Sequence, residues 1–213
     1  MKTRLFVAAG IMSVMLSPPS TLAQTAVTYY HPSPIQQAYR SGQAAPDKEA
    51  ARAHYRHGID LAREILQPAP DDADALLWLA ANLGAEALTH GKLYALRVIG
   101  EIESTLLHLE RVNPNYDDAA AARSLANLYW KAPAIISVGS TKKAASYFQL
   151  ALARAPEFPG NQALVAGFYL DQHDCGRARP LALAVSARAD LDAFGPDAAE
   201  WRKIVADVFG SCR

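Results

Sequence analysis

One boundary pattern recurs along the chain and constrains its fold more than any other feature. A run compatible with an amphipathic helix ends at a proline, and an acidic or amide residue follows where a new helix can begin. The pattern occurs at Pro70, Pro114 and Pro156, at separations of 44 and then 42 residues, and a shorter unit closes at Asp190, 34 residues after Pro156. Since no run of alternating β-branched residues accompanies it, the sequence predicts an all-α domain over 48–213.

A helix-turn-helix period of 34 residues is typical of tetratricopeptide repeats, in which small residues let paired helices approach closely and large residues fill the space between them. The small and large positions in register with the prolines are Gly58, Ala62, Ile65, Leu76, Leu79, Ala80, Leu83, Leu125, Ala126, Tyr129, Ala144, Phe148, Ala151, Val165, Ala166, Tyr169, Ala178, Ala182 and Val185. The two longer units would add residues as long helices over 73–89 and 92–111 and as a loop over 132–141. Asp197 is expected to cap a closing helix that ends near Phe209. We therefore predict a tetratricopeptide-like helical-hairpin solenoid with a C-terminal capping helix.

The amino terminus has the pattern of a secretory signal peptide. Lys2 and Arg4 precede an apolar run over 5–16, and a helix-breaking Pro/Ser stretch leads to a predicted cut before Gln24. The apolar run is shorter than the about 20 residues that cross a bilayer, so a retained anchor is the less favoured interpretation. We expect residues 1–23 to be a signal peptide and the mature protein to be periplasmic.

The residues after the predicted cut differ in composition from the rest of the chain. Residues 24–47 are rich in Pro, Gln and Ser, which predicts an extended leader or a partly ordered linker before the helical domain. No cysteine lies near the cut, so the lipid-bearing cysteine of a bacterial lipoprotein is missing and we expect no lipid anchor.

Charge and cysteine content narrow the classes further. The chain of 213 residues carries 21 Lys and Arg against 21 Asp and Glu, whereas a nucleic-acid-binding protein normally shows a basic excess. Its two cysteines, Cys175 and Cys212, can form one intramolecular disulfide in an oxidising compartment. Two inert thiols or an intermolecular bridge are the alternatives.

Two segments of the predicted third unit resemble a known family. Residues 123–133 read Arg-Ser-Leu-Ala-Asn-Leu-Tyr-Trp-Lys-Ala-Pro, and residues 137–144 read Ser-Val-Gly-Ser-Thr-Lys-Lys-Ala. Together with Tyr147-Phe148 and with Leu-Leu-Trp-Leu-Ala-Ala-Asn-Leu-Gly at 76–84, they are similar to the TatT component family over roughly residues 50–190. Members of that family are periplasmic tetratricopeptide-like proteins associated with tripartite ATP-independent periplasmic (TRAP) transporters.

The resemblance implies a non-catalytic accessory protein, with a homotrimer as its expected assembly, that binds a periplasmic substrate-binding protein or a small organic acid. A general envelope scaffold that binds peptides or proteins in its concave groove is the alternative. Many family members are lipoproteins, and this chain departs from that pattern.

The first helix of each tetratricopeptide pair usually lines the groove, which makes one helical face the candidate binding site. Arg123, Asn127 and Trp130 lie at i, i+4 and i+7 on that face, and an Arg and an Asn one turn apart resemble part of a carboxylate clamp. We add Lys131 and Lys142 as candidate contacts. The structural alternative packs Trp130 under the 132–141 loop and pairs Arg123 with an acid such as Asp118.

Residues that could carry chemistry do not form a complete site in the sequence. His54 and His57 lie three apart on a predicted helix but lack a third metal ligand, and His173-Asp174-Cys175 is more consistent with a helical corner than with a nucleophile and its base. The segment 139–143 lacks the residue order of a phosphate loop. We therefore expect no enzyme activity, no cofactor and no metal.

Overall fold

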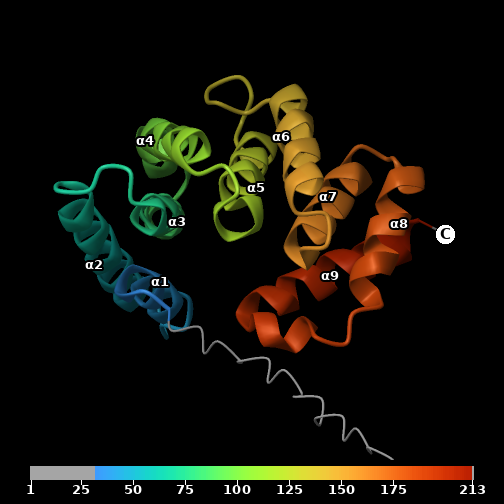
Figure 1. Ribbon diagram of the computed structural model, residues 1–213, viewed down its shortest axis with the longest axis horizontal. Coiled ribbons are helices and arrows are strands. Elements are labelled where there is room, and N and C mark those ends of the chain that lie inside the picture. The colour runs from blue at the N-terminus through green and yellow to red at the C-terminus, as the bar shows by residue number, and fades with distance from the viewer. Residues whose placement is uncertain (1–31, 213) are drawn as a thin grey trace, which may run out of the picture. The chain divides into compact units, whose positions relative to one another are not determined.

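The computed structural model describes residues 32–212, so the predicted signal peptide and the first part of the predicted leader lie outside the described residues. The described residues form four helical hairpins, a short 3-10 helix and a last α-helix, with no strand among them (Figure 1). The elements are α1 (Pro34–Gln43), α2 (Lys48–Leu66), α3 (Ala73–His90), α4 (Lys92–Val112), α5 (Tyr116–Lys131), α6 (Thr141–Arg154), α7 (Pro159–Asp171), α8 (Cys175–Ser186), η1 (Leu191–Phe194) and α9 (Pro196–Ser211). The prediction of an all-α, helical-hairpin fold is confirmed.

The hairpin boundaries follow the predicted punctuation. Helices α2, α4 and α6 each end within four residues before Pro70, Pro114 or Pro156. Asp72 Oδ1 accepts a hydrogen bond from the Ala75 amide at 2.8 Å, and Ser140 Oγ accepts one from the Lys143 amide at 3.2 Å, so each side chain caps the helix that follows it. These short connections keep successive helices antiparallel.

The junction between α3 and α4 needs a glycine. Gly91 ends α3 and begins α4 with φ at +100°, a conformation that L side chains rarely adopt. The long helices predicted over 73–89 and 92–111 therefore meet at a single-residue turn, and their observed bounds lie within one residue of the prediction.

The core forms at the positions predicted from the repeat. Leu125 and Tyr129 of α5, Phe148 of α6, Val165 of α7 and the alanines beside them are buried in one cluster that runs between the hairpins. Among the predicted core positions, Ile65 is instead exposed at the end of α2. Trp78 lies at the edge of the core, where it packs against Tyr39 with ring centroids 5.5 Å apart.

The predicted leader is wrong from residue 34 onward, because α1 forms there. Ser33 caps this helix, Pro34 occupies its first turn, and Ile35 and Ala38 are buried against α2 and α3. The Pro, Gln and Ser content suggested an extended segment, yet Pro is well tolerated in a first helical turn and Ser is a favoured cap. The amphipathic spacing of Ile35 and Ala38 was the signal that composition concealed.

The closing helix is held on both sides of the last hairpin. Ala198, Trp201, Val205 and Val208 of α9 are buried against α7 and α8. Cys175 at the start of α8 and Cys212 at the end of α9 form a disulfide with their Cα atoms 5.4 Å apart, which confirms the predicted pairing. A disulfide is typical of proteins in oxidising compartments. None of the helices among residues 32–212 has the length and apolarity that a membrane span requires.

Candidate functional site

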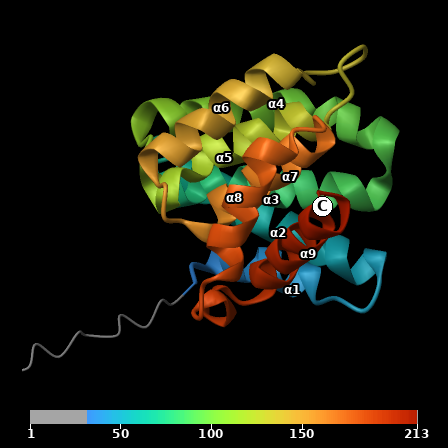
Figure 2. The same cartoon turned by 90° about the vertical axis from the view of Figure 1, so that its right-hand side faces the viewer.

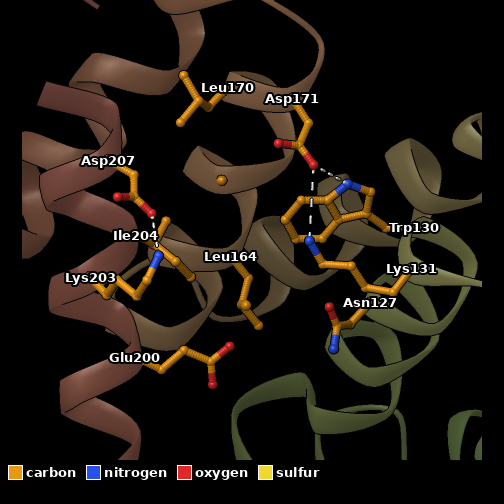
Figure 3. A pocket seen from close by; sticks show the side chains of 11 residues that line it. Asn127, Trp130, Lys131, Leu164, Leu170, Asp171, Glu200, Lys203, Ile204 and Asp207 are labelled. Carbon is orange, nitrogen blue, oxygen red and sulfur yellow. Dashed lines mark hydrogen bonds and ion pairs between the residues drawn. The ribbon is translucent and has the colours of Figure 1, made fainter. Parts of the chain in front are cut away.

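A pocket of about 190 Å³ opens between the end of α5, the outer part of α7 and the middle of α9 (Figure 3). Three of the five residues predicted to make contacts line it, namely Asn127, Trp130 and Lys131. The facing wall comes from α9, whose contribution the sequence did not reveal. Leu164 and Ile204 supply apolar surface between these two polar walls.

The Trp130 side chain is fixed by contacts on its ring and on its nitrogen. Its ring packs edge-on against Phe148 and Phe168, with centroid separations of 5.9 and 6.1 Å. Its Nε1 donates a hydrogen bond to Asp171 Oδ2 at 3.0 Å. Gly167 lets α7 approach, since a Cβ there would lie 3.3 Å from the indole. Trp130 therefore packs in the structure and still presents part of its surface to the pocket.

Lys131 lies on the Trp130 ring. Its Nζ is 3.1 Å from the ring centroid and 3.9 Å from Asp171 Oδ2, a cation–π contact joined to a weak ion pair. Partial burial lowers the pKa of Lys131, and the charge of Asp171 acts in the opposite direction. The ammonium is thus compensated within the protein, which reduces its availability to an external carboxylate.

The α9 wall carries a carboxylate that no cation of the described residues pairs with directly. Lys203 Nζ and Asp207 Oδ2 form an exposed ion pair at 2.7 Å. Glu200 precedes that pair by one turn and points into the pocket in Figure 3, and it makes no hydrogen bond or ion pair within residues 32–212. With Lys131 and Lys203 matched by Asp171 and Asp207, the pocket carries the uncompensated charge of Glu200.

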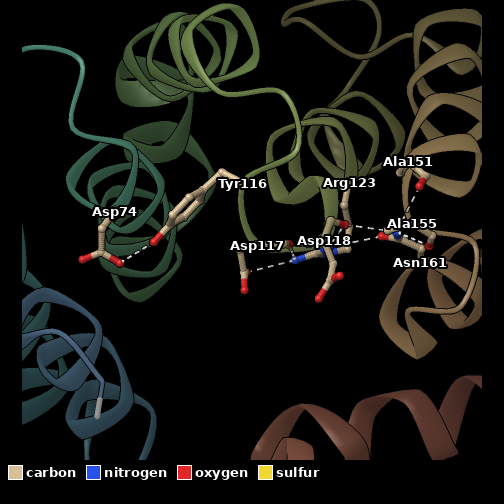
Figure 4. Close-up of polar contacts among 8 residues, drawn as sticks. All are labelled: Asp74, Tyr116, Asp117, Asp118, Arg123, Ala151, Ala155 and Asn161. Atoms are coloured by element: carbon tan, nitrogen blue, oxygen red, sulfur yellow. Dashed lines mark hydrogen bonds and ion pairs between the residues drawn. The ribbon is translucent and has the colours of Figure 1, made fainter. Parts of the chain in front are cut away.

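Arg123 does not line this pocket. Its side chain is only 15% exposed, and its Nη1 donates hydrogen bonds to the Asp118 carbonyl at 2.9 Å and to Asn161 Oδ1 at 3.2 Å (Figure 4). The guanidinium also lies over the Phe158 ring, 4.6 Å from its centroid. Burial lowers the pKa of Arg123, and the nearby acids partly offset that effect. These contacts join α5 to α7, which makes a structural role the better interpretation.

The Arg123 contacts stabilise an unusual start of α5. Asp117, Asp118 and Ala119 all have left-handed backbone angles, with φ between +46° and +62°. Such conformations are unfavourable for residues with a Cβ, so the surrounding structure has to hold them. Arg123 bonds the Asp117 and Asp118 carbonyls, and Asn161 Nδ2 also donates to the Asp118 carbonyl at 3.2 Å.

The remaining predicted contacts separate in the structure. The Asn127 amide makes no hydrogen bond within the described part of the chain, and it faces the pocket. Lys142 is exposed in the first turn of α6, away from the residues that line the pocket. The sequence therefore identified the α5 wall but could not place the α9 wall, because it did not show which face of α9 meets α7.

The groups considered for chemistry take structural positions. Cys175 is in the disulfide, and Asp174 caps α8 and pairs with Arg177, which lowers the pKa of Asp174. The residues His173, Asp174 and Cys175 consequently do not form a nucleophile with its base. Across residues 32–212, His, Cys, Asp and Glu side chains form no group of three or more that could hold a metal ion.

Comparisons with known proteins identify the fold. No protein-family model matches the chain, and no curated protein matches it. The crystal structure of a thermophilic tetratricopeptide-repeat protein from Thermus thermophilus is similar to it, with a TM-score of 0.53 and 16% sequence identity over 82% of this chain and 98% of that one. The chain thus has an all-α, tetratricopeptide-like solenoid fold of helical hairpins with a closing helix.

Proposed function

We propose that this protein is a non-catalytic scaffold that binds a partner protein through the pocket between α5, α7 and α9. The observation that supports this most directly is the pairing of unused polar groups with fixed apolar surface. Glu200 and Asn127 have no hydrogen-bond partner within residues 32–212, while Trp130 and Leu164 beside them form a fixed apolar surface. Partly buried aromatic anchors next to available polar groups are common at protein interfaces.

The size and charge of the pocket favour side chains of a protein over a small organic acid. Its volume of about 190 Å³ is below the roughly 300–1,000 Å³ of most small-molecule sites. An organic acid would also meet the uncompensated carboxylate of Glu200, whereas a Lys or Arg next to an apolar residue would complement it. The proposed partner therefore presents a basic side chain beside an apolar one.

We further propose that the protein acts in the periplasm. Residues 1–23 have the pattern of a signal peptide, and the Cys175–Cys212 disulfide suits an oxidising compartment. The resemblance of residues 123–133 and 137–144 to the TatT family makes a TRAP substrate-binding protein the first partner to test, with assembly into a homotrimer as a linked proposal. A scaffold for other envelope proteins is the alternative.

The pocket proposal predicts a charge-sensitive interaction. Changing Glu200→Gln is expected to weaken binding of the partner by about tenfold, and Glu200→Lys by more, because the basic side chain loses its counter-charge and then meets a like charge. Titration calorimetry with a purified TRAP substrate-binding protein measures both. Glu64→Gln is the matched control, since Glu64 is exposed on α2 and lies outside the pocket.

Two outcomes would separate the parts of this proposal. Binding that is unchanged in the Glu200→Lys variant would remove the pocket as the contact surface. If the TRAP protein does not bind but another envelope protein binds with the predicted dependence on Glu200, the scaffold proposal stands and the transporter role is wrong.

A further inference from the structure

The largest exposed apolar side chains gather at two connections of the solenoid. The four that we call the apolar tips are 67–97% exposed, and they are Leu88, Leu93, Ile135 and Ile136. The first two flank the turn between α3 and α4, and the other two lie in the loop between α5 and α6. Isolated exposed apolar residues are ordinary, but a group of this kind on protruding connections suggests contact with another apolar phase.

The two connections lie on the same side of the described unit. Helices α1, α3, α5 and α7 run in one direction, so the connections that follow them are on one side, to the right in Figure 2. Contacts agree with this arrangement. Arg52 near the start of α2 donates to the Thr89 carbonyl at 2.9 Å, and Tyr129 near the end of α5 donates to Glu103 of α4 at 2.7 Å.

The residues around the apolar tips are basic without exception among the charged types. The segments 87–100 and 131–146, together called the turn edge, contain five Lys and Arg and no Asp or Glu. Lys143 pairs with Glu103 at 3.4 Å and Lys131 with Asp171 at 3.9 Å, both from outside the turn edge. Arg97 and Lys142 are exposed and make no ion pair within residues 32–212.

The opposite side has the reverse charge. The segments 67–74, 113–118 and 155–158, which connect or begin the next hairpins, contain six Asp and Glu and no Lys or Arg. The balanced composition of the chain therefore conceals a separation of charge along the helix direction. Such a separation would orient the protein with its turn edge toward a negatively charged surface.

We propose that the turn edge docks on an anionic lipid surface, with the apolar tips entering the interface and the basic residues facing the headgroups. Each Lys or Arg close to an anionic leaflet contributes favourably, and apolar side chains on protruding connections can enter the interface without rearrangement of the helices. The pocket between α5, α7 and α9 is not part of the turn edge except for Lys131. Docking therefore leaves the pocket accessible to a partner.

A lipid surface explains the turn edge better than a protein partner does. The apolar tips are aliphatic and sit on two separate protrusions, whereas protein interfaces are enriched in aromatic residues, Met and Arg at their centres. A second copy could offer its acidic side, but none of the large exposed apolar residues lies in the three acidic segments. The apolar tips would find no apolar counterpart there.

Vesicle co-sedimentation of the exported chain tests this proposal. We expect binding to phosphatidylcholine vesicles with about 30% phosphatidylglycerol, little binding to phosphatidylcholine alone, and a steep loss between about 50 and 300 mM salt. The Ile135→Ser/Ile136→Ser variant should bind at least about tenfold more weakly, because it removes two apolar tips. Lys142→Gln should weaken binding less and reduce the salt dependence.

The controls keep the amino terminus constant, so that segment cannot account for a difference between forms. Leu183→Ser changes an exposed apolar residue of α8, and Arg111→Gln changes an exposed base at the other end of α4, and neither should alter binding. Equal binding by the wild type and the Ile135→Ser/Ile136→Ser variant, or no binding of the wild type to anionic vesicles at low salt, would falsify the proposal. Loss of self-association in that variant with unchanged vesicle binding would identify a second copy as the occupant instead.

Discussion

Replacing Arg123 by Met is expected to lower the free energy of unfolding by about 3 kcal/mol, which corresponds to a fall of roughly 10 °C in the midpoint of thermal unfolding. The buried guanidinium is the main side chain that bonds the carbonyls of the left-handed segment Asp117–Ala119. Without it, that segment keeps the Asn161 contact to the Asp118 carbonyl but loses the donors to Asp117. Thermal and urea unfolding followed by circular dichroism measure the change.

Two further variants identify the cause of the expected loss. Arg123→Lys keeps the positive charge but not the planar fork, so we expect about half the effect. Arg111→Met is the matched control, because Arg111 is exposed and makes no ion pair among the described residues, and it should change stability by less than about 0.5 kcal/mol. A free energy of unfolding for Arg123→Met within that same range would show that the guanidinium does not hold the turn.

The Arg123 result also distinguishes the two interpretations of its sequence position. The i, i+4, i+7 spacing correctly placed Arg123, Asn127 and Trp130 on one helix, but it could not show how deeply each is buried. Asn161 of α7, 38 residues away, accepts from Arg123 and so draws it into the packing between α5 and α7. If Arg123 is structural, folded Arg123→Met protein should bind the partner as the wild type does. A groove contact would predict weaker binding at temperatures where the variant is folded.

The fold was predictable because its signals are local. Pro70, Pro114 and Pro156 fix where helices end, and the alternation of small and large residues at 3.6-residue spacing fixes which faces are buried. The helix α1 was missed because composition outweighed the spacing of only two buried side chains, Ile35 and Ala38. A ten-residue helix of that kind depends on packing against α2 and α3, which local patterns do not report.

The site was predictable on one wall only. Asn127 and Trp130 follow from the repeat register, since the first helix of a pair usually faces the groove. Glu200 lies on the closing helix, which has no repeat to place it in register. Its position depends on how α9 packs across α7, a contact between segments separated by three connections. The charge separation between the two sides of the solenoid was likewise concealed, because the chain as a whole is neutral.

The closing helix also determines the second large effect, that of the Cys175–Cys212 disulfide. A bridge that closes a loop of 37 residues is expected to stabilise the folded chain by roughly 3–4 kcal/mol through the entropy of the unfolded state. The Cys175→Ser/Cys212→Ser variant should therefore unfold roughly 10 °C below the wild type under oxidising conditions. Val208 and Trp201 of α9 cover α7 and α8, so the loss should begin with exposure of that face.

Reductant provides the internal control for this prediction. Dithiothreitol should lower the unfolding midpoint of the wild type to that of the double serine variant, and it should leave the variant unchanged because no other cysteine exists in the chain. Because Glu200 and Ile204 reach the pocket from α9, the reduced protein should also bind its partner more weakly as the closing helix loosens. A midpoint that does not respond to reductant would mean that packing alone holds α9 in place. The pocket would then be independent of the redox state, and the disulfide would not contribute to its geometry.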